Sequence, residues 1–226
     1  MKYIVTGIDG GLGKYLYETI PNSLGINRNN LNSILSKIDT DDIIIHCAFN
    51  KTNKIANYYS YLEDNIFLTK QLLELGNRII YISSIDVYLR DNIYSMFKKF
   101  AEAIIRKNNN NLIIRCPLFL GKYMKTNHLT KLRDNEQSLT LRRNSSFNYI
   151  TYEDVFKFIT TTSLKGVCDL ISKDNVELNT IKQLFNAKTV LGNYKYETTS
   201  QFANPIYTGR TSLETVKIYF KLIKDT

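Results

Sequence analysis

The feature that most constrains the fold is an alternation of short apolar runs with longer amphipathic segments through the first half of the chain. The apolar runs are rich in β-branched residues and carry no polar face, as expected of strands covered on both sides. The predicted strands are Tyr3–Val5, Leu24–Asn27, Ile43–Ile45, Ile79–Ile82 and Leu112–Ile114. The predicted helices between them span 12–19, 58–75 and 94–105. This alternation predicts an α/β fold with a doubly wound parallel sheet.

The alternation loosens after Pro117. Residues 121–146 are polar and irregular, whereas 152–161 and 212–224 have helical patterns and 167–171 has a strand pattern. We therefore predict a single compact unit with a sheet core in residues 1–120. Residues 121–226 should form a mixed region, with a small substrate-binding lobe and elements that return to the core.

Charge and composition limit the classes of function. The chain has 30 basic and 21 acidic residues, a net charge of +9, but its basic residues are scattered in pairs such as Lys98–Lys99. This pattern favours a small anionic ligand and argues against a nucleic-acid partner, which basic clusters would indicate. No apolar stretch reaches the roughly 18 residues of a membrane span, so we expect a cytoplasmic protein without a membrane partner. The three cysteines lack metal-ligand spacing, and no metal is predicted.

A glycine-rich loop, Thr6–Gly13, follows the first predicted strand and opens the first predicted helix. Its GxxGxxG spacing allows a tight turn and a close approach of the backbone to a pyrophosphate, which a helix N-terminus also favours. An ordinary βα turn is the alternative interpretation. The dinucleotide interpretation makes the core a Rossmann-like NAD(P)-binding domain. Its expected cofactor contacts are Gly7, Asp9, Gly10, Gly11, Leu12 and Gly13.

The end of the second strand indicates which dinucleotide binds. Arg28 follows this strand, and no acidic residue follows until Asp39. An arginine there accommodates the 2′-phosphate of NADP, whereas an acid binds the ribose hydroxyls of NAD. Asp9 in the glycine loop argues the other way, because a carboxylate repels a phosphate. We therefore predict NADP, with NAD as the alternative.

Tyr94 and Lys98 are four residues apart and share one face of a predicted helix. A lysine cation near a phenol favours the phenolate and prepares the tyrosine for proton transfer. A surface pair of this kind also arises by chance, so the surrounding motifs decide. Ser83–Tyr88 ends the strand before this helix and would present a hydroxyl to the ligand crevice.

Several motifs in order along the chain carry a resemblance. They are Thr6–Gly13, Asp42–Ala48, Asn65–Leu73, Ser83–Tyr88, Tyr94–Glu102, Ile113–Gly121, Phe147–Val155 and Gly166–Leu170. In this order they resemble the extended short-chain dehydrogenase/reductase family, the NAD(P)-dependent nucleotide-sugar epimerases, dehydratases and reductases. The resemblance implies that Tyr94 is the acid/base and that Lys98 holds the nicotinamide ribose and lowers the tyrosine pKa. It also implies that Ser84 hydrogen-bonds the substrate oxygen and that Ala48 and Pro117 line the cofactor channel.

The chain departs from the family pattern in three places. Ser84 and Tyr94 are only ten positions apart, so a loop that covers the sugar in the family is missing. Phe147 stands where the family has an arginine that contacts the diphosphate. Ile85–Asp86 replaces the Asp-Glu pair of the dehydratases, which argues against that activity.

Asp86 and His128 match acid/base positions of the family's reductases that epimerise before reducing. A carboxylate and an imidazole on opposite sides of one carbon could move its proton. Structural roles for both residues are the alternative. We therefore expect an NAD(P)H-dependent reductase, or epimerase/reductase, of a nucleotide-linked keto-sugar. The alternatives are an NAD-retaining 4-epimerase and a non-catalytic dinucleotide-binding protein. The family also implies a homodimer through the helices at 58–75 and 94–105.

Overall fold

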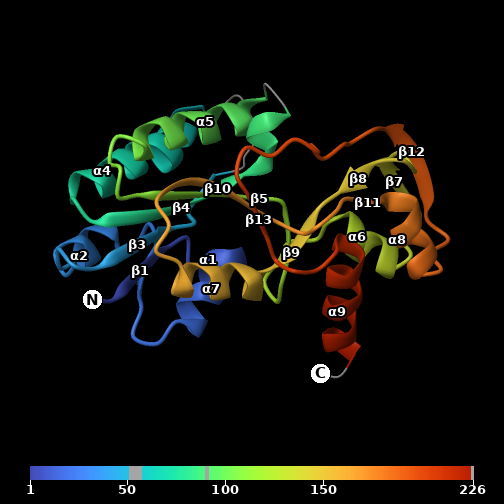
Figure 1. Cartoon of the computed structure of the whole chain (residues 1–226), viewed down its shortest axis with the longest axis horizontal. Helices are drawn as coiled ribbons and strands as arrows, with labels where there is room; N and C mark the ends of the chain where they lie inside the picture. Colours follow the sequence, from blue (N-terminus) through green and yellow to red (C-terminus); the bar gives the residue numbers. More distant parts are fainter. Residues whose placement is uncertain (51–57, 90–91, 225–226) are drawn as a thin grey trace.

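Seven parallel strands form the central sheet of the computed structural model, which describes residues 1–50, 58–89 and 92–224 (Figure 1). Their spatial order is β13-β10-β5-β4-β3-β1-β2, and every neighbouring pair is parallel. The strands are β1 (Tyr3–Thr6), β2 (Leu24–Ile26), β3 (Ile43–His46), β4 (Arg78–Ser84), β5 (Leu112–Cys116), β10 (Gly166–Ile171) and β13 (Pro205–Tyr207). The predicted Rossmann-like doubly wound sheet is confirmed. The chain reverses its direction across the sheet between β1 and β3, where ligands bind in open α/β folds.

Helices cover both faces of this sheet (Figure 1). One face lies against α1 (Gly11–Thr19) and α7 (Tyr152–Thr161), and the other against α4 (Leu68–Glu74) and α5 (Ile93–Ile105), with the short α2 (Leu31–Leu35) near the β2 edge. Successive strand residues serve the two layers alternately: Val5 and Ile45 pack with α1 and α7, whereas Ile4 and Ile44 pack with α4 and α5. This alternation explains why the strands are apolar throughout.

The helix expected over 58–75 is interrupted. α3 (Tyr58–Leu62) passes into a π-helical segment, η2 (Glu63–Phe67), before α4 begins at Leu68. The backbone of Asn50 explains the irregular segment, because its N–H donates to Asn65 Oδ1 at 2.7 Å and its carbonyl accepts from Asn65 Nδ2 at 3.2 Å. Periodicity alone does not reveal such a long-range contact.

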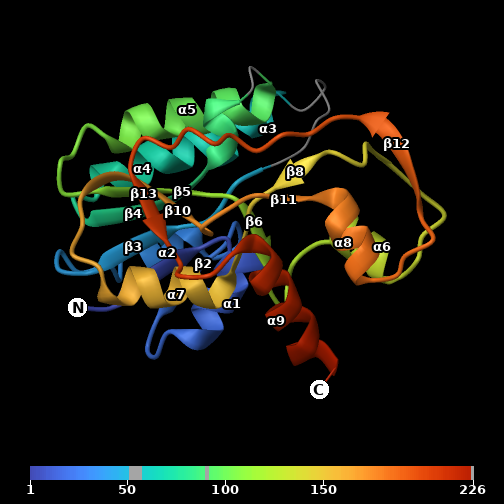
Figure 2. The same cartoon turned by 45° about the vertical axis from the view of Figure 1, so that its right-hand side comes forward.

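Apart from α7, β10 and β13, the elements after residue 117 build a smaller lobe beside the sheet (Figure 2). Its elements are β6 (Leu118–Leu120), α6 (His128–Arg133), β7 (Ser138–Leu141), β8 (Ser146–Phe147), β9 (Tyr149–Thr151), β11 (Val176–Glu177), α8 (Leu178–Leu184), β12 (Val190–Tyr194) and α9 (Ser212–Lys224). They surround a separate apolar cluster that includes Leu132, Phe147 and Val216. The expectation that 121–146 is irregular is wrong for α6 and β7. A capping box between Asn127 and Thr130 starts α6, and β7 pairs with the distant β12.

A segment that we call the strap, residues 195–204, connects β12 of the smaller lobe to β13 of the sheet (Figures 1 and 2). The N–H of Thr198 donates to the carbonyl of Ser146, and the N–H of Ala203 donates to the hydroxyl of Tyr88. Tyr88 ends η3 (Ile85–Tyr88), the short 3₁₀ helix after β4. The strap therefore runs along the carboxyl edge of the sheet. Within the described residues, no helix combines the length and apolar character needed to cross a membrane.

A buried ion pair joins α5 to the sheet. Arg115 of β5 donates to Glu102 of α5 through Nε at 2.9 Å and Nη2 at 2.6 Å, and Ser83 Oγ donates to the same carboxylate at 2.7 Å. The side chains of Arg115 and Glu102 are only 11% and 4% exposed. Burial alone would raise the pKa of Glu102, but the hydrogen bonds from Arg115 and Ser83 outweigh it and lower the pKa.

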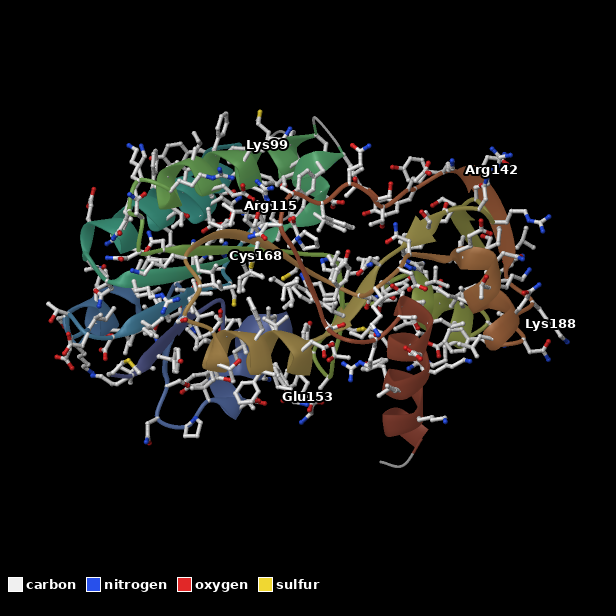
Figure 3. The ribbon with its side chains drawn as sticks, viewed as in Figure 1. Lys99, Arg115, Arg142, Glu153, Cys168 and Lys188 are labelled. Carbon is white, nitrogen blue, oxygen red and sulfur yellow. The ribbon has the colours of Figure 1, made fainter. Side chains whose placement is uncertain are left out.

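We expect Glu102→Gln to lower the free energy of unfolding by about 3 kcal/mol, because it leaves Arg115 buried without its counter-charge. The pKa of Glu102 is lower in the folded state than in the unfolded state. The difference in unfolding free energy between the variant and the parent should therefore have its full size above pH 4.5, and it should shrink as the pH falls through the folded-state pKa. Urea unfolding of both proteins across this range measures it. Glu153→Gln, on the outer surface of α7 (Figure 3), is the control and should have little effect. An equal loss in the two variants would contradict the analysis.

Candidate active site

The carboxyl ends of β1 and β3 are tied together by Thr6. Its hydroxyl oxygen accepts from the N–H groups of Cys47 at 3.1 Å and Ala48 at 3.0 Å, and its hydroxyl lies 2.8 Å from His46 Nδ1. His46 Nε2 lies 2.9 Å from Thr69 Oγ1, whose own proton goes to a backbone carbonyl. His46 is therefore a neutral bridge, and burial lowers its pKa to about 3.

The glycine loop fits a dinucleotide pyrophosphate. Gly7 has a positive φ of 76°, and an added Cβ would stand 2.9 Å from the backbone of Ala48. A Cβ on Gly13 would stand 2.3 Å from the Gly7 carbonyl oxygen, so α1 packs too closely for a side chain. Gly10 precedes α1, and a Cβ added to it would meet no atom within 4 Å. No side chain caps the amides of the first turn of α1, and this turn contains no acidic residue. These amides and the open approach suit an anion at the start of α1.

Ser84 and Tyr94 meet where β4 ends and α5 begins. A hydrogen bond joins the two side chains, and Ser84 Oγ also accepts from the N–H of Asp86 at 3.2 Å. Asn92 caps α5 by accepting from Ser95 N–H, and Ser95 Oγ donates to the carbonyl of Asp86 at 3.1 Å. These bonds fix the first turn of α5 against η3. The short connection therefore still brings the predicted serine and tyrosine together.

Lys98 lies one turn after Tyr94 and is buried. Its Nζ donates to the carbonyl of Ile82 at 2.7 Å and lies 4.0 Å from the ring centre of Phe49 and 4.7 Å from that of Tyr81. The Phe49 ring also meets the Tyr94 ring edge-on at 5.1 Å. The ammonium is thus held between the ends of β3 and β4, beside the predicted channel residue Ala48.

The pKa of Tyr94 is raised above its ordinary value. Burial is the largest cause, and the negative charge of Asp86 acts in the same direction, while the hydrogen bond from Ser84 opposes them. The sequence led us to expect a lowered pKa through Lys98, and this expectation is wrong for the net shift. Tyr94 is a protonated phenol at neutral pH in this structure.

A row of side chains joins Asp86 to His128. Tyr196 of the strap donates from its hydroxyl to Asp86 Oδ1 at 2.8 Å, and its ring stacks on Phe147 at 4.9 Å with planes 5° apart. Phe147 in turn stacks on His128 at 4.1 Å. Two aromatic rings therefore stand between the residues predicted to act on one carbon. The phenylalanine at the family's arginine position contributes an aromatic face.

His128 opens on the smaller lobe. Its Nε2 lies 2.5 Å from the hydroxyl of Tyr149, and burial lowers its pKa to about 4. It lines a cavity of about 420 Å³ together with Asn127, Lys131 and β7. Arg142 does not lie beside His128. It is exposed at the end of the smaller lobe that is remote from the sheet (Figure 3).

The remaining predicted cofactor contacts lie at two places. Pro117 is buried directly after β5, next to Cys116, which is in register with Ser84. Asp9 and Arg28 lie at the other end of the site, beyond β1 and β2, where Asp9 Oδ1 accepts from the side-chain amide of Asn27 at 3.0 Å. The guanidinium of Arg28 is paired with Asp64.

Three residues of this site were not predicted from the sequence: Phe49, Tyr196 and Asp64. Phe49 carried a signal, since it directly follows the predicted channel residue Ala48. Tyr196 and Asp64 reach the site only through contacts 110 and 36 positions away in sequence. The described part of the chain contains no cluster of histidine, cysteine, aspartate and glutamate that could hold a metal ion.

Searches by sequence find neither a family model nor a curated protein that matches this chain. Solved structures do match. A dTDP-4-dehydrorhamnose reductase from Bacillus anthracis in complex with NADP is 18% identical, with a TM-score of 0.79 over 98% of this chain and 99% of that one. The ADP-L-glycero-D-manno-heptose-6-epimerase of Helicobacter pylori is 16% identical, with a TM-score of 0.78 over 100% and 96% of the two chains.

A UDP-glucuronic acid 4-epimerase from Bacillus cereus in complex with NAD is 17% identical, with a TM-score of 0.72 over 100% of this chain and 98% of that one. These likenesses extend over essentially the whole length of each chain. They confirm, at the level of the fold, the resemblance to nucleotide-sugar reductases and epimerases that the motifs carry.

We expect both histidines to stay neutral down to about pH 5, because burial holds their pKa values near 3 for His46 and 4 for His128. Since an unfolded histidine has a pKa of about 6.5, the unfolded state binds more protons below that pH, and stability should fall as the pH falls through 6.5. NMR titration of the imidazole C–H resonances measures the pKa values, and His128→Gln assigns them. A His128 midpoint above 6 would contradict the burial argument.

Proposed function

We propose that the protein is an NAD(P)H-dependent reductase that converts a nucleotide-linked keto-sugar to its alcohol. The observation that carries the proposal is the assembly of Ser84, Tyr94 and buried Lys98 at the end of β4, on the same carboxyl edge of the parallel sheet as an uncapped glycine loop. A hydroxyl, a phenol and an ammonium held together next to a pyrophosphate site suit proton delivery to a carbonyl that accepts a hydride. Structural neighbours whose names include dTDP-, ADP- and UDP-sugars support the substrate class.

The residues along this edge of the sheet would have separate tasks. The amides at the start of α1 would hold the pyrophosphate, and Lys98 would hold the nicotinamide ribose. A bound dinucleotide would supply the hydride. Ala48 and Pro117 would flank its path between the glycine loop and Tyr94.

Tyr94 would give its phenolic proton to the carbonyl oxygen of the sugar, while Ser84 donates a hydrogen bond to the same oxygen. The raised pKa of Tyr94 keeps the phenol protonated at neutral pH, which is the form that reduction requires. An epimerase that begins by oxidising its substrate needs the phenolate instead. The NAD-retaining 4-epimerase therefore stays as the alternative, and product analysis decides between the two.

Residues 121–226 would supply the substrate lobe as well as core elements. Phe147 and Tyr196 present stacked rings near Asp86, and the strap would take the place of the loop that is missing between Ser84 and Tyr94. Because two rings separate Asp86 from His128, the arrangement favours reduction without prior epimerisation. The homodimer remains a prediction, with Phe67 and Phe100 exposed on the helices expected to meet.

The experiment that tests the proposal incubates the protein with NADPH or NADH and with dTDP-, UDP- and ADP-linked keto-sugars. Oxidation of the dinucleotide that depends on both protein and sugar would support reduction. Conversion of one nucleotide sugar into its epimer without net oxidation would identify an epimerase. Dinucleotide binding with no turnover of any sugar would favour the non-catalytic alternative.

We expect Tyr94→Phe to lower the turnover number about 10²- to 10⁴-fold, because the variant cannot deliver the proton. Dinucleotide affinity should stay close to that of the parent, since the glycine loop and Lys98 are unchanged. Stopped-flow oxidation of NADPH measures the rate, and nicotinamide emission measures binding. Tyr207→Phe, on the edge strand β13, is the matched control and should keep full activity. Equal rates for Tyr94→Phe and the parent would exclude Tyr94 as the acid.

A further inference from the structure

The guanidinium of Arg28, the residue expected to meet a 2′-phosphate, is occupied by a carboxylate. Its Nε donates to Asp64 Oδ1 at 3.2 Å and its Nη2 donates to Asp64 Oδ2 at 2.5 Å. The side chain of Arg28 is 78% exposed, whereas that of Asp64 is only 22% exposed. The pair therefore places a carboxylate beneath an arginine that faces solvent.

Asp64 is held in this position by its surroundings. It belongs to the π-helical segment η2, which lies 36 positions after Arg28 in the sequence. The side-chain amide of Asn50 donates to Asp64 Oδ2 at 2.8 Å, and the backbone of Asn50 is itself bound to the side chain of Asn65. A carboxylate fixed by both Arg28 and Asn50 is a more persistent partner than one on a freely rotating surface side chain.

A second carboxylate lies near Arg28. Asp9, in the glycine loop, accepts from the side-chain amide of Asn27, the residue before Arg28. Its charge acts on Arg28 in the same direction as that of Asp64 and favours the guanidinium cation. Two anions therefore act on one cation at the place where the adenosine ribose of a dinucleotide would lie.

We propose that Asp64 is a cofactor-specificity residue, which acts by occupying the arginine that would otherwise select the 2′-phosphate. The 2′-phosphate dianion of NADPH would have to share the guanidinium with Asp64 and would be repelled by two carboxylates. The uncharged 2′-hydroxyl of NADH meets neither penalty. The protein consequently binds NADH and NADPH with similar affinity, although Arg28 alone would favour NADPH. This inference rests on the proposed function, because it concerns the dinucleotide of that site.

The test compares Asp64→Asn with the parent protein. The substitution removes one negative charge, keeps the shape of the side chain and frees the guanidinium. The affinity ratio of NADPH to NADH, measured by nicotinamide emission, should rise about fivefold, as expected for loss of a partly exposed charge pair. The effect should weaken at high salt. Glu63→Gln removes the same charge from the neighbouring, exposed residue of η2 and should leave the ratio unchanged.

A second probe needs neither nicotinamide nor turnover. Calorimetric titration with 2′,5′-ADP and with 5′-ADP should show the same selective gain for the 2′-phosphate in Asp64→Asn. Arg28→Ala should weaken 2′,5′-ADP alone, and Asp64→Asn should give a smaller gain in the Arg28→Ala background. Asp64→Ser serves as a second variant should the asparagine perturb folding.

The outcomes separate the two proposals. If the parent binds neither dinucleotide and neither adenosine diphosphate, the proposed function fails. If the parent binds them and Asp64→Asn leaves the ratio within about twofold, the role of Asp64 is overturned while the proposed function stands. An equal rise in Glu63→Gln would likewise overturn it, because the effect would then be one of net charge alone.

Discussion

The buried pair of Glu102 and Arg115 is the constraint on which the site depends. Glu102 lies on the same helix as Tyr94 and Lys98, and its carboxylate also binds Ser83, the neighbour of Ser84. One carboxylate thus positions α5 against the ends of β4 and β5 at the same time. Because a buried charge without its partner is costly, the helix cannot slide along the sheet without losing these bonds. The serine, the tyrosine and the lysine therefore keep one relative placement.

The same network reaches the strap. Arg115 Nη1 donates to the hydroxyl of Tyr88 at 2.6 Å, and that hydroxyl donates to Asp169 of β10. Asp169 and Tyr88 in turn accept from the N–H groups of Asn204 and Ala203 in the strap. The strap is thereby fixed at its far end, while Tyr196 at its near end binds Asp86. The strap, which is distant in sequence, thus contacts Asp86 and Tyr88, both of which lie between Ser84 and Tyr94.

Features of this chain that depend on contacts close in sequence could be predicted, whereas those that depend on contacts far apart in sequence could not. The strands were predicted because burial on both faces leaves a local apolar run. Tyr94 and Lys98 were paired because residues four apart share one face of a helix. The two-residue strands β8 and β11 have no local pattern and depend on pairing with each other and, for β8, with the strap. The π-helical turn at Asp64 and the stacking of Tyr196 on Phe147 likewise depend on contacts far apart in sequence. The direction of the Tyr94 shift was missed because burial is a tertiary property that a motif does not report.

The two ends of the proposed dinucleotide site are therefore held by interactions of different strength. At the reacting end, the counter-charges are buried, so a change at Glu102 or Arg115 acts on folding before it acts on chemistry. At the adenosine end, Arg28 is mostly exposed and its pairing with Asp64 is screened by solvent. A substitution there can alter which phosphate pattern binds without disturbing the sheet. Under the proposed function, proton delivery would be tied to the fold, whereas the choice of dinucleotide would rest on a few surface charges.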